Sequence, residues 1–113
     1  MSWLKAQIEK NPKKLFIQEG NSQYTYQDVG EMVKAYSKAF LKDGIQPQDK
    51  ILIYLPGSIE MVEIILACFE IGAVASPISQ GLTNHERNAV IVSIKPKLII
   101  TNWENKSAFK SYS

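Results

Sequence analysis

The sequence is poor in the residues that most often build reactive centres. It has one cysteine, Cys68, and one histidine, His85, among 113 residues. A single cysteine excludes an internal disulfide bond and any metal site built from several thiolates. Low cysteine usage of this kind fits a reducing compartment, and we expect a cytoplasmic protein.

Long hydrophobic runs and an excess of one charge are also missing. The longest apolar stretch, residues 59–74, is interrupted by Glu60, Glu63 and Glu70, whereas about 20 apolar residues are needed to cross a bilayer. We therefore expect no transmembrane segment, and the amphipathic first ten residues do not resemble a signal peptide. The net charge of +2, from 13 basic and 11 acidic residues, argues against nucleic acid as a partner.

The remaining composition is that of an ordinary folded domain. Hydrophobic residues make up 45% and charged residues 21% of the chain, which argues against a disordered protein. The length allows one domain or a piece of a larger one. Because no repeat, low-complexity segment or internal linker is visible, we treat residues 1–113 as a single unit.

Hydrophobic periodicity and turn residues predict an α/β fold. A short helix at residues 3–10 and a hairpin of two short strands come first. Strands and helices then alternate, with strands expected at 50–55, 73–77 and 97–101 and helices that begin at the N-caps Thr25, Ser58 and Thr83. This alternation with short loops is typical of a parallel sheet with right-handed crossovers and flanking helices.

Two of these helices carry distinct apolar patterns. The helix after Thr25 places one set of residues on a single face at helical spacing: Val29, Met32, Val33, Tyr36 and Phe40. The helix from Ser58 to Ile71 is apolar nearly all round, which is typical of a helix covered on several sides. We therefore expect Ile65, in the middle of this helix, to be buried.

Few residues suggest catalysis. His85 falls in the first turn of a helix, where a solvated side chain is expected, and Cys68 lies among apolar neighbours, as a small core residue does. The acidic residues are spread over predicted helix surfaces, so no carboxylate pair can be nominated for general acid–base chemistry.

The glycines form neither a dinucleotide fingerprint nor a lysine-bearing phosphate loop. The segment Leu55–Ser58 does precede a helix N-terminus, where anions can bind. That signal is weak, and a tight turn capped by Ser58 is the favoured interpretation of the same residues.

Six short segments, taken in order, resemble the adenylate-forming enzymes, which include acyl-CoA synthetases, peptide-synthetase adenylation domains and luciferases. They are Tyr24–Asp28 (YTYQD), Gly44–Ile51 (GIQPQDKI), Ile53–Glu60 (IYLPGSIE), Leu66–Val74 (LACFEIGAV), Ser76–Ser79 (SPIS) and the pair Thr83 and Glu86. Two positions depart from the family pattern, because Gln48 replaces the usual glycine and Gly57 the common asparagine.

The resemblance implies that the chain is the N-terminal part of the large domain of an ATP-dependent acid–thiol ligase. Such a ligase forms an acyl-adenylate and then an acyl-CoA, so ATP, Mg²⁺ and coenzyme A are implied for the parent enzyme. The family's ATP-binding and catalytic motifs are absent from these residues. We therefore expect no catalytic residue, no cofactor bound by this chain alone, and no activity of the isolated chain.

The same resemblance assigns one segment a role in binding. In relatives, the loop that matches Ser79, Gln80 and Gly81 lies near the tunnel for the pantetheine arm of the thiol, although an ordinary surface loop fits these residues as well. The implied partner is the remainder of the ligase large domain, or a second copy of the chain. The first helix begins almost at once, at Trp3 and Leu4, and this short start is similar to that of bacterial o-succinylbenzoate–CoA ligases of menaquinone synthesis.

Two other readings remain open. The chain could be a free-standing interaction module that kept the fold without catalysis. It could also be a small independent doubly wound domain with a chance resemblance. An open reading frame that continues after Ser113 would favour the ligase fragment over the free-standing module.

Overall fold

The computed structural model describes residues 2–102. Its elements follow the predicted order, and the α/β class is confirmed. They are α1 (Ser2–Lys10), β1 (Leu15–Glu19), β2 (Ser22–Thr25), α2 (Tyr26–Lys42), β3 (Lys50–Tyr54), α3 (Ile59–Ile71), β4 (Val74–Pro77), α4 (Asn84–Ile94) and β5 (Leu98–Thr101). Within the described part of the chain, no helix is both long enough and apolar enough to span a bilayer.

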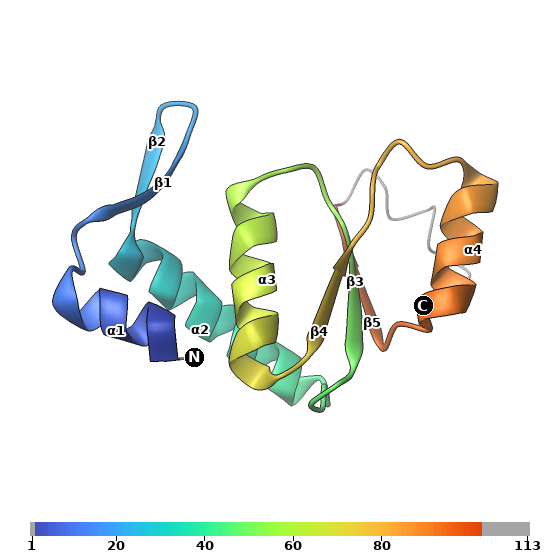
Figure 1. The fold of residues 1–113 in the computed structure, drawn as a ribbon, viewed down its shortest axis with the longest axis horizontal. Coiled ribbons are helices and arrows are strands. Elements are labelled where there is room, and N and C mark those ends of the chain that lie inside the picture. Colours follow the sequence, from blue (N-terminus) through green and yellow to red (C-terminus); the bar gives the residue numbers. More distant parts are fainter. Residues whose placement is uncertain (1, 103–113) are drawn as a thin grey trace.

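The centre of the fold is a parallel sheet with the strand order β4-β3-β5. β3 pairs on both sides, with Ile51 opposite Ala75 on β4 and Leu98 on β5. A strand with neighbours on both edges and helices on both faces has to be apolar throughout. The middle of β3 accordingly consists of branched aliphatic residues that are fully buried. α3 and α4 cover opposite faces of this sheet (Figure 1).

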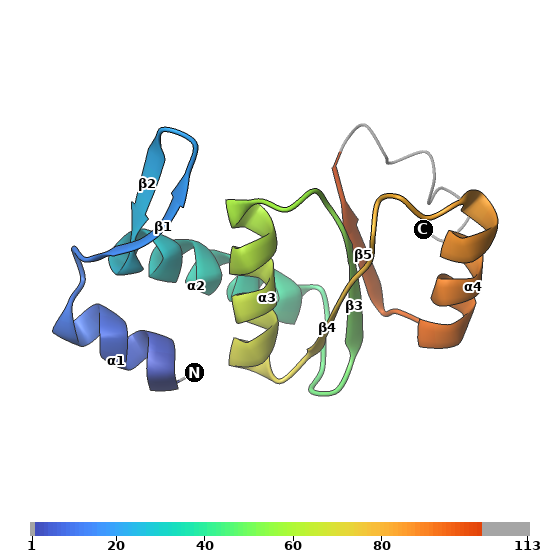
Figure 2. The ribbon, with the colours of Figure 1, turned by 45° about the horizontal axis from the view of Figure 1, so that its top comes forward.

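α1 and the two strands β1 and β2 lie beyond α3, on the side away from α4, and α2 runs from there behind α3 toward the sheet (Figures 1 and 2). β1 and β2 form the expected antiparallel hairpin. α1 packs close to α2, where the side chain of Ile8 fills the space that a Cβ atom at Gly30 would need. Trp3, Phe16 and Tyr26 join α1, β1 and α2 through edge-to-face ring contacts.

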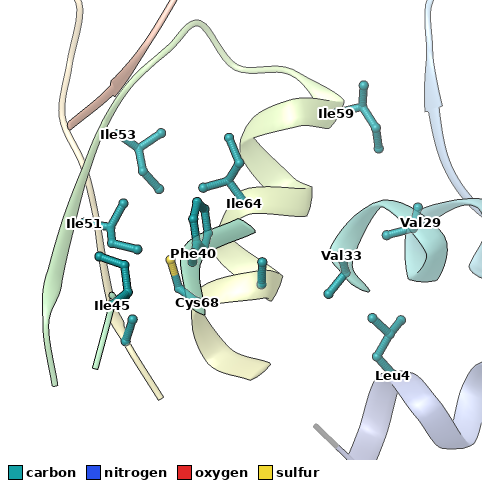
Figure 3. Packing of buried hydrophobic residues seen from close by; sticks show 12 residues of the cluster. Leu4, Val29, Val33, Phe40, Ile45, Ile51, Ile53, Ile59, Ile64 and Cys68 are labelled. Atoms are coloured by element: carbon teal, nitrogen blue, oxygen red, sulfur yellow. The ribbon is translucent and has the colours of Figure 1, made fainter. Parts of the chain in front are cut away.

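The main core lies between α2, α3 and β3 (Figure 3). Ile51 and Ile53 point from β3 toward Ile64 and Cys68 on α3, and Phe40 of α2 reaches the same space. α3 is therefore covered on two sides, by α2 and by the sheet. This agrees with the expected cover on several sides, but Ile65, which was expected to be buried, is only partly buried, and Phe69 is 64% exposed.

The local signals for helix ends are confirmed. Thr25 and Thr83 each form a capping box with the acidic residue three positions later, and Ser58 accepts a hydrogen bond from the backbone of Met61. The predicted buried face of α2 needs one correction. Met32 is 43% exposed, and Ser37 is buried in its place. Ser37 continues the four-residue spacing of Val29 and Val33, whereas Met32 lies at the edge of that stripe.

Candidate functional site

The topology itself marks one position as suited to ligand binding. β3 is followed by α3 on one face of the sheet, and β4 is followed by α4 on the other (Figure 1). The two connections therefore leave adjacent parallel strands in opposite directions. In open α/β sheets, ligands bind in the crevice outside the carboxyl ends of such a strand pair. Here that position lies between residues 55–58 and residues 78–82.

The second of these segments contains the three residues that the resemblance singled out. Ser79, Gln80 and Gly81 are all exposed. The Ser79 hydroxyl accepts a hydrogen bond from the Gly81 backbone nitrogen at 3.0 Å, which makes a tight local turn. Ile78, just before the turn, donates its backbone N–H to the Ile53 carbonyl at 3.0 Å. The loop thus starts directly beside the end of β3.

Tyr54 contacts the loop directly, and Arg87 contacts Tyr54. The Tyr54 hydroxyl donates to the Gln80 carbonyl oxygen at 3.3 Å. The Arg87 guanidinium carbon lies 5.7 Å from the centre of the Tyr54 ring, and its Nη2 donates to Asn84 Oδ1 at 2.7 Å. Both Tyr54 and Arg87 are buried.

The sequence reasoning missed this pair, although a signal existed. Arg87, Ile91 and Ile94 have the i, i+4, i+7 spacing of a core-facing helix stripe. A charged residue in such a stripe is unusual unless it has partners. Tyr54 is likewise the one aromatic residue in the strand Lys50–Tyr54.

The other segment, residues 55–58, leads into the N-terminus of α3. That helix end already has an acidic partner, because Ile59 donates its backbone N–H to Glu19 Oε2 at 2.7 Å. A carboxylate at a helix N-terminus satisfies the free N–H groups and the helix dipole. It would also repel a phosphate group at the same place. The turn capped by Ser58 is therefore the better description of this loop, and these residues do not fit the phosphates of ATP.

Glu63 corrects the expectation that the acidic residues all lie on helix surfaces. It is 4% exposed. Burial, and then the nearby charge of Glu60, raise the pKa of Glu63 to about 7. The charges of Glu63 and Glu60 also help raise the pKa of Tyr36 on α2, after burial of that phenol. Glu63 therefore lies close to Tyr36 on α2.

Cys68 and His85 have the environments that were predicted for them. Cys68 is fully buried, and burial raises the pKa of its thiol to about 11, so the reactive thiolate is disfavoured. His85 is exposed at the start of α4. In residues 2–102, no group of three or more His, Cys, Asp or Glu side chains is placed to bind a metal ion.

A depression of about 520 Å³ lies at the opposite, amino-terminal end of the sheet strands. Its lining includes three lysines, Lys50, Lys95 and Lys97, and one acidic residue, Asp49. Asp49 accepts a hydrogen bond from the Gln46 backbone at 2.7 Å, which closes the turn before β3. The depression therefore lies at the other end of the sheet from the Ser79–Gly81 loop.

Comparison with known proteins identifies relatives along nearly the whole chain. The model of the family described as AMP-binding enzyme matches residues 4–112. Human acyl-CoA synthetase short-chain family member 3, mitochondrial, is 35% identical over 78 residues, which are 69% of this chain and 11% of that protein. The 2-succinylbenzoate–CoA ligase of Oceanobacillus iheyensis is 32% identical over 107 residues, which are 94% of this chain and 22% of the ligase.

Solved structures show the same fold. O-succinylbenzoate coenzyme A synthetase (MenE) from Bacillus subtilis, in complex with AMP, superposes with a TM-score of 0.89 at 20% identity. VinN in complex with L-aspartate superposes with a TM-score of 0.91 at 19% identity. Each match covers 97% of this chain, but only 29% of the MenE chain and 31% of the VinN chain. The 113 residues thus span between a tenth and a third of the relatives they match.

Proposed function

The chain belongs to the AMP-binding enzyme family, and from that premise we propose that it is the N-terminal part of the large domain of an ATP-dependent acid–thiol ligase. In this proposal the parent enzyme activates a carboxylic acid as its adenylate and transfers the acyl group to coenzyme A. The isolated chain provides a structural frame and one loop of the thiol tunnel, and it is inactive alone.

One observation carries this proposal: the family match extends over residues 4–112, yet the chain covers only 11% and 22% of two relatives that are acid–CoA ligases by name. The six motif segments lie in the order expected for the start of such an enzyme. Similarity to a 2-succinylbenzoate–CoA ligase over 94% of the chain supports an aromatic or dicarboxylic acid as one substrate to test first.

The described residues do not by themselves fit ATP and Mg²⁺. The α3 N-terminus is occupied by the Glu19 carboxylate, and the sequence has no glycine-rich phosphate loop. We therefore assign nucleotide and metal binding to the remainder of the parent enzyme. Within this chain, the role that the geometry supports is to shape a passage at the carboxyl ends of β3 and β4.

The Ser79–Gly81 loop is suited to that role by size and by hydrogen bonding. Gly81 has no side chain to obstruct a thin ligand, and the Ser79 hydroxyl is turned back onto the Gly81 backbone nitrogen. The loop is exposed at the carboxyl ends of β3 and β4, and backbone groups can guide the amide-containing pantetheine arm of a thiol by hydrogen bonding.

An ATP–pyrophosphate exchange assay tests the proposal. Purified chain should give only background exchange with a panel of acids that includes succinylbenzoate, while a full-length 2-succinylbenzoate–CoA ligase in the same assay gives a strong signal. Exchange above background from the pure chain would show that these residues are sufficient for adenylation, and the assignment as an inactive part would be wrong.

The association state tests the partner. α3 leaves Phe69 64% exposed, and β4 and β5 are both sheet edges in the described structure. Such surfaces favour association with the remainder of the large domain or, in its absence, with a second copy. Sedimentation should show concentration-dependent association that Phe69→Ser weakens more than Leu41→Ser, a control whose residue on α2 is 56% exposed. A monomer at all concentrations would favour a free-standing interaction module.

A further inference from the structure

We propose that Tyr54 and Arg87 are positioning residues that fix the Ser79–Gly81 loop over the carboxyl ends of β3 and β4. The inference rests on the proposed function only for the identity of the ligand that passes this loop. The contacts themselves are independent of it. They connect three elements that are distant in sequence: the end of β3, the loop after β4 and the first turn of α4.

The loop is attached to the fold at its two ends by backbone and capping hydrogen bonds. At the start, Ile78 donates to the Ile53 carbonyl at 3.0 Å. At the end, the Thr83 and Glu86 capping box closes α4, and the two backbone N–H groups satisfied there lie at 3.1 and 2.9 Å from their acceptors. Between these points, the Tyr54 hydroxyl contacts the Gln80 carbonyl oxygen at 3.3 Å, from an element 26 positions away in sequence.

The ring of Tyr54 contributes to packing, whereas its hydroxyl contributes to positioning of the loop. Its ring lies in a small apolar cluster with Leu52 and Ile91, and a phenylalanine would fill the same space. The hydroxyl adds one hydrogen bond to a loop carbonyl, and such a bond contributes about 1 kcal/mol net. The hydroxyl therefore affects the order of the loop much more than the packing of the cluster.

Arg87 fixes the Tyr54 ring from the α4 side. Its guanidinium lies 5.7 Å from the ring centre, within the range of a cation–π contact. The same group donates to Asn84 Oδ1 at 2.7 Å, so it connects the ring to the first turn of α4. A planar guanidinium can stack and donate at once, which a lysine cannot do in the same geometry. At 8% exposure this arginine is costly to bury, which favours a specific role over simple packing.

Amide hydrogen exchange on the 113-residue chain tests the positioning role. Tyr54→Phe should accelerate exchange of the Gly81 and Leu82 amides about fivefold, the factor that corresponds to one lost hydrogen bond of about 1 kcal/mol. Amides in the middle of α3 should be unchanged, which shows that the effect is local. Tyr36→Phe removes a hydroxyl from α2 and serves as the matched control, with no effect on the loop.

Arg87 is tested by a pair of substitutions. Arg87→Met keeps the length of the side chain but removes the cation and its hydrogen bonds, and it should loosen the loop as much as Tyr54→Phe. Arg87→Lys should restore at most part of the protection. Loop exchange that is unchanged in Tyr54→Phe overturns the proposal. If Arg87→Met does not fold, Tyr54→Phe alone decides, because it leaves the packing intact.

A second readout separates this inference from the proposed function. In a full-length ligase that carries this segment, Tyr54→Phe should raise KM for the thiol several-fold and leave the rate of adenylate formation unchanged. A loosened loop without a change in KM for the thiol would keep the positioning role but refute the role of the loop in the tunnel. An unchanged loop with intact thiol binding would refute the positioning role alone.

Discussion

Within residues 2–102, the face of the sheet under α3 has a thick apolar core, whereas the buried hydrophobic cluster under α4 consists of Leu52, Tyr54 and Ile91. The alternation of side chains along β3 accounts for the division, because Ile51 and Ile53 point to the first face and Leu52 and Tyr54 to the second. On the α3 face, α1 and α2 add further apolar layers (Figure 2). On the α4 face, Val92 is 67% exposed and Arg87 replaces an aliphatic residue in the stripe.

This difference indicates that the two faces have different roles. The α3 face supplies most of the buried apolar area and therefore most of the hydrophobic stabilisation. The α4 face carries the polar contacts that reach the Ser79–Gly81 loop. Among the described residues, this face is therefore the more thinly packed of the two.

The largest expected loss of stability comes from replacing a buried isoleucine by alanine, and the same replacement can be made on each face of the sheet. Ile64→Ala on α3 should cost about 3 to 4 kcal/mol, because it opens a cavity in a core that several elements enclose. Ile91→Ala on α4 should cost about 2 kcal/mol, since fewer neighbours surround it and the site can collapse. Urea unfolding followed by circular dichroism measures both, and equal losses would contradict the contrast between the faces.

The buried acid Glu63 should weaken the α3 face as the pH rises. The pKa of Glu63 is about 7 in the folded chain, above the value of about 4.3 for a free glutamate. The protonated form is therefore favoured by folding, so its contribution is complete below about pH 4 and is lost as the pH rises through 7. Local relaxation and water penetration offset part of the cost of a buried charge, so Glu63→Gln should stabilise the chain by about 1 to 2 kcal/mol at pH 8.

The pH dependence makes this prediction specific. At pH 4 the stabilities of Glu63→Gln and the unsubstituted chain should converge, because Glu63 is then protonated in both the folded and the unfolded states. Glu31→Gln, at an exposed position of α2, controls for the loss of one negative charge. A gain that is the same at both pH values would mean that ionisation of Glu63 is not its cause.

The sequence predicted the elements well where the signal was local. Capping pairs, such as Thr25 with Asp28, set helix starts through contacts three residues apart, so they can be read without tertiary structure. The buried stripe of α2 was only partly predicted, because Met32 and Ser37 exchange roles according to where α3 packs. The sheet was predicted as parallel, but the central place of β3 depends on pairing with β4 and β5, which no local pattern encodes.

The candidate site was harder to predict. The Ser79–Gly81 loop was nominated through the family resemblance, and its role in a tunnel remains a proposal. Tyr54 and Arg87 were missed because their contact joins elements far apart in sequence. The partner of the α3 N-terminus was missed for the same reason, since Glu19 lies 40 positions before Ile59. Glu63 was missed because an acidic residue in a helix is ordinarily solvated.

A smaller loss of stability tests how the β1–β2 hairpin supports α3. Glu19 on β1 accepts the backbone N–H of Ile59 at 2.7 Å and so caps α3 from a distant element. Glu19→Ala should cost about 1 kcal/mol, the usual value for a lost helix cap. Glu9→Ala, at an exposed position of α1, is the matched control and should be close to neutral. Equal effects of the two substitutions in thermal unfolding would show that this cap contributes little.

The smallest expected change in stability is at Gln48, in the turn just before β3. Its φ of 74° is in the left-handed region, where side chains are disfavoured. The family pattern has glycine there, and Gln48→Gly should relieve about 1 kcal/mol of backbone strain in the folded chain. Glycine also raises the entropy of the unfolded chain, which offsets part of this gain in stability. We expect a net gain in stability of about 0.5 kcal/mol.

Gln46→Gly, in the same turn but without a positive φ, should instead destabilise the chain by a similar amount. Opposite signs for the two glycine substitutions in urea unfolding would establish that backbone conformation decides the outcome, and a loss at both positions would contradict it.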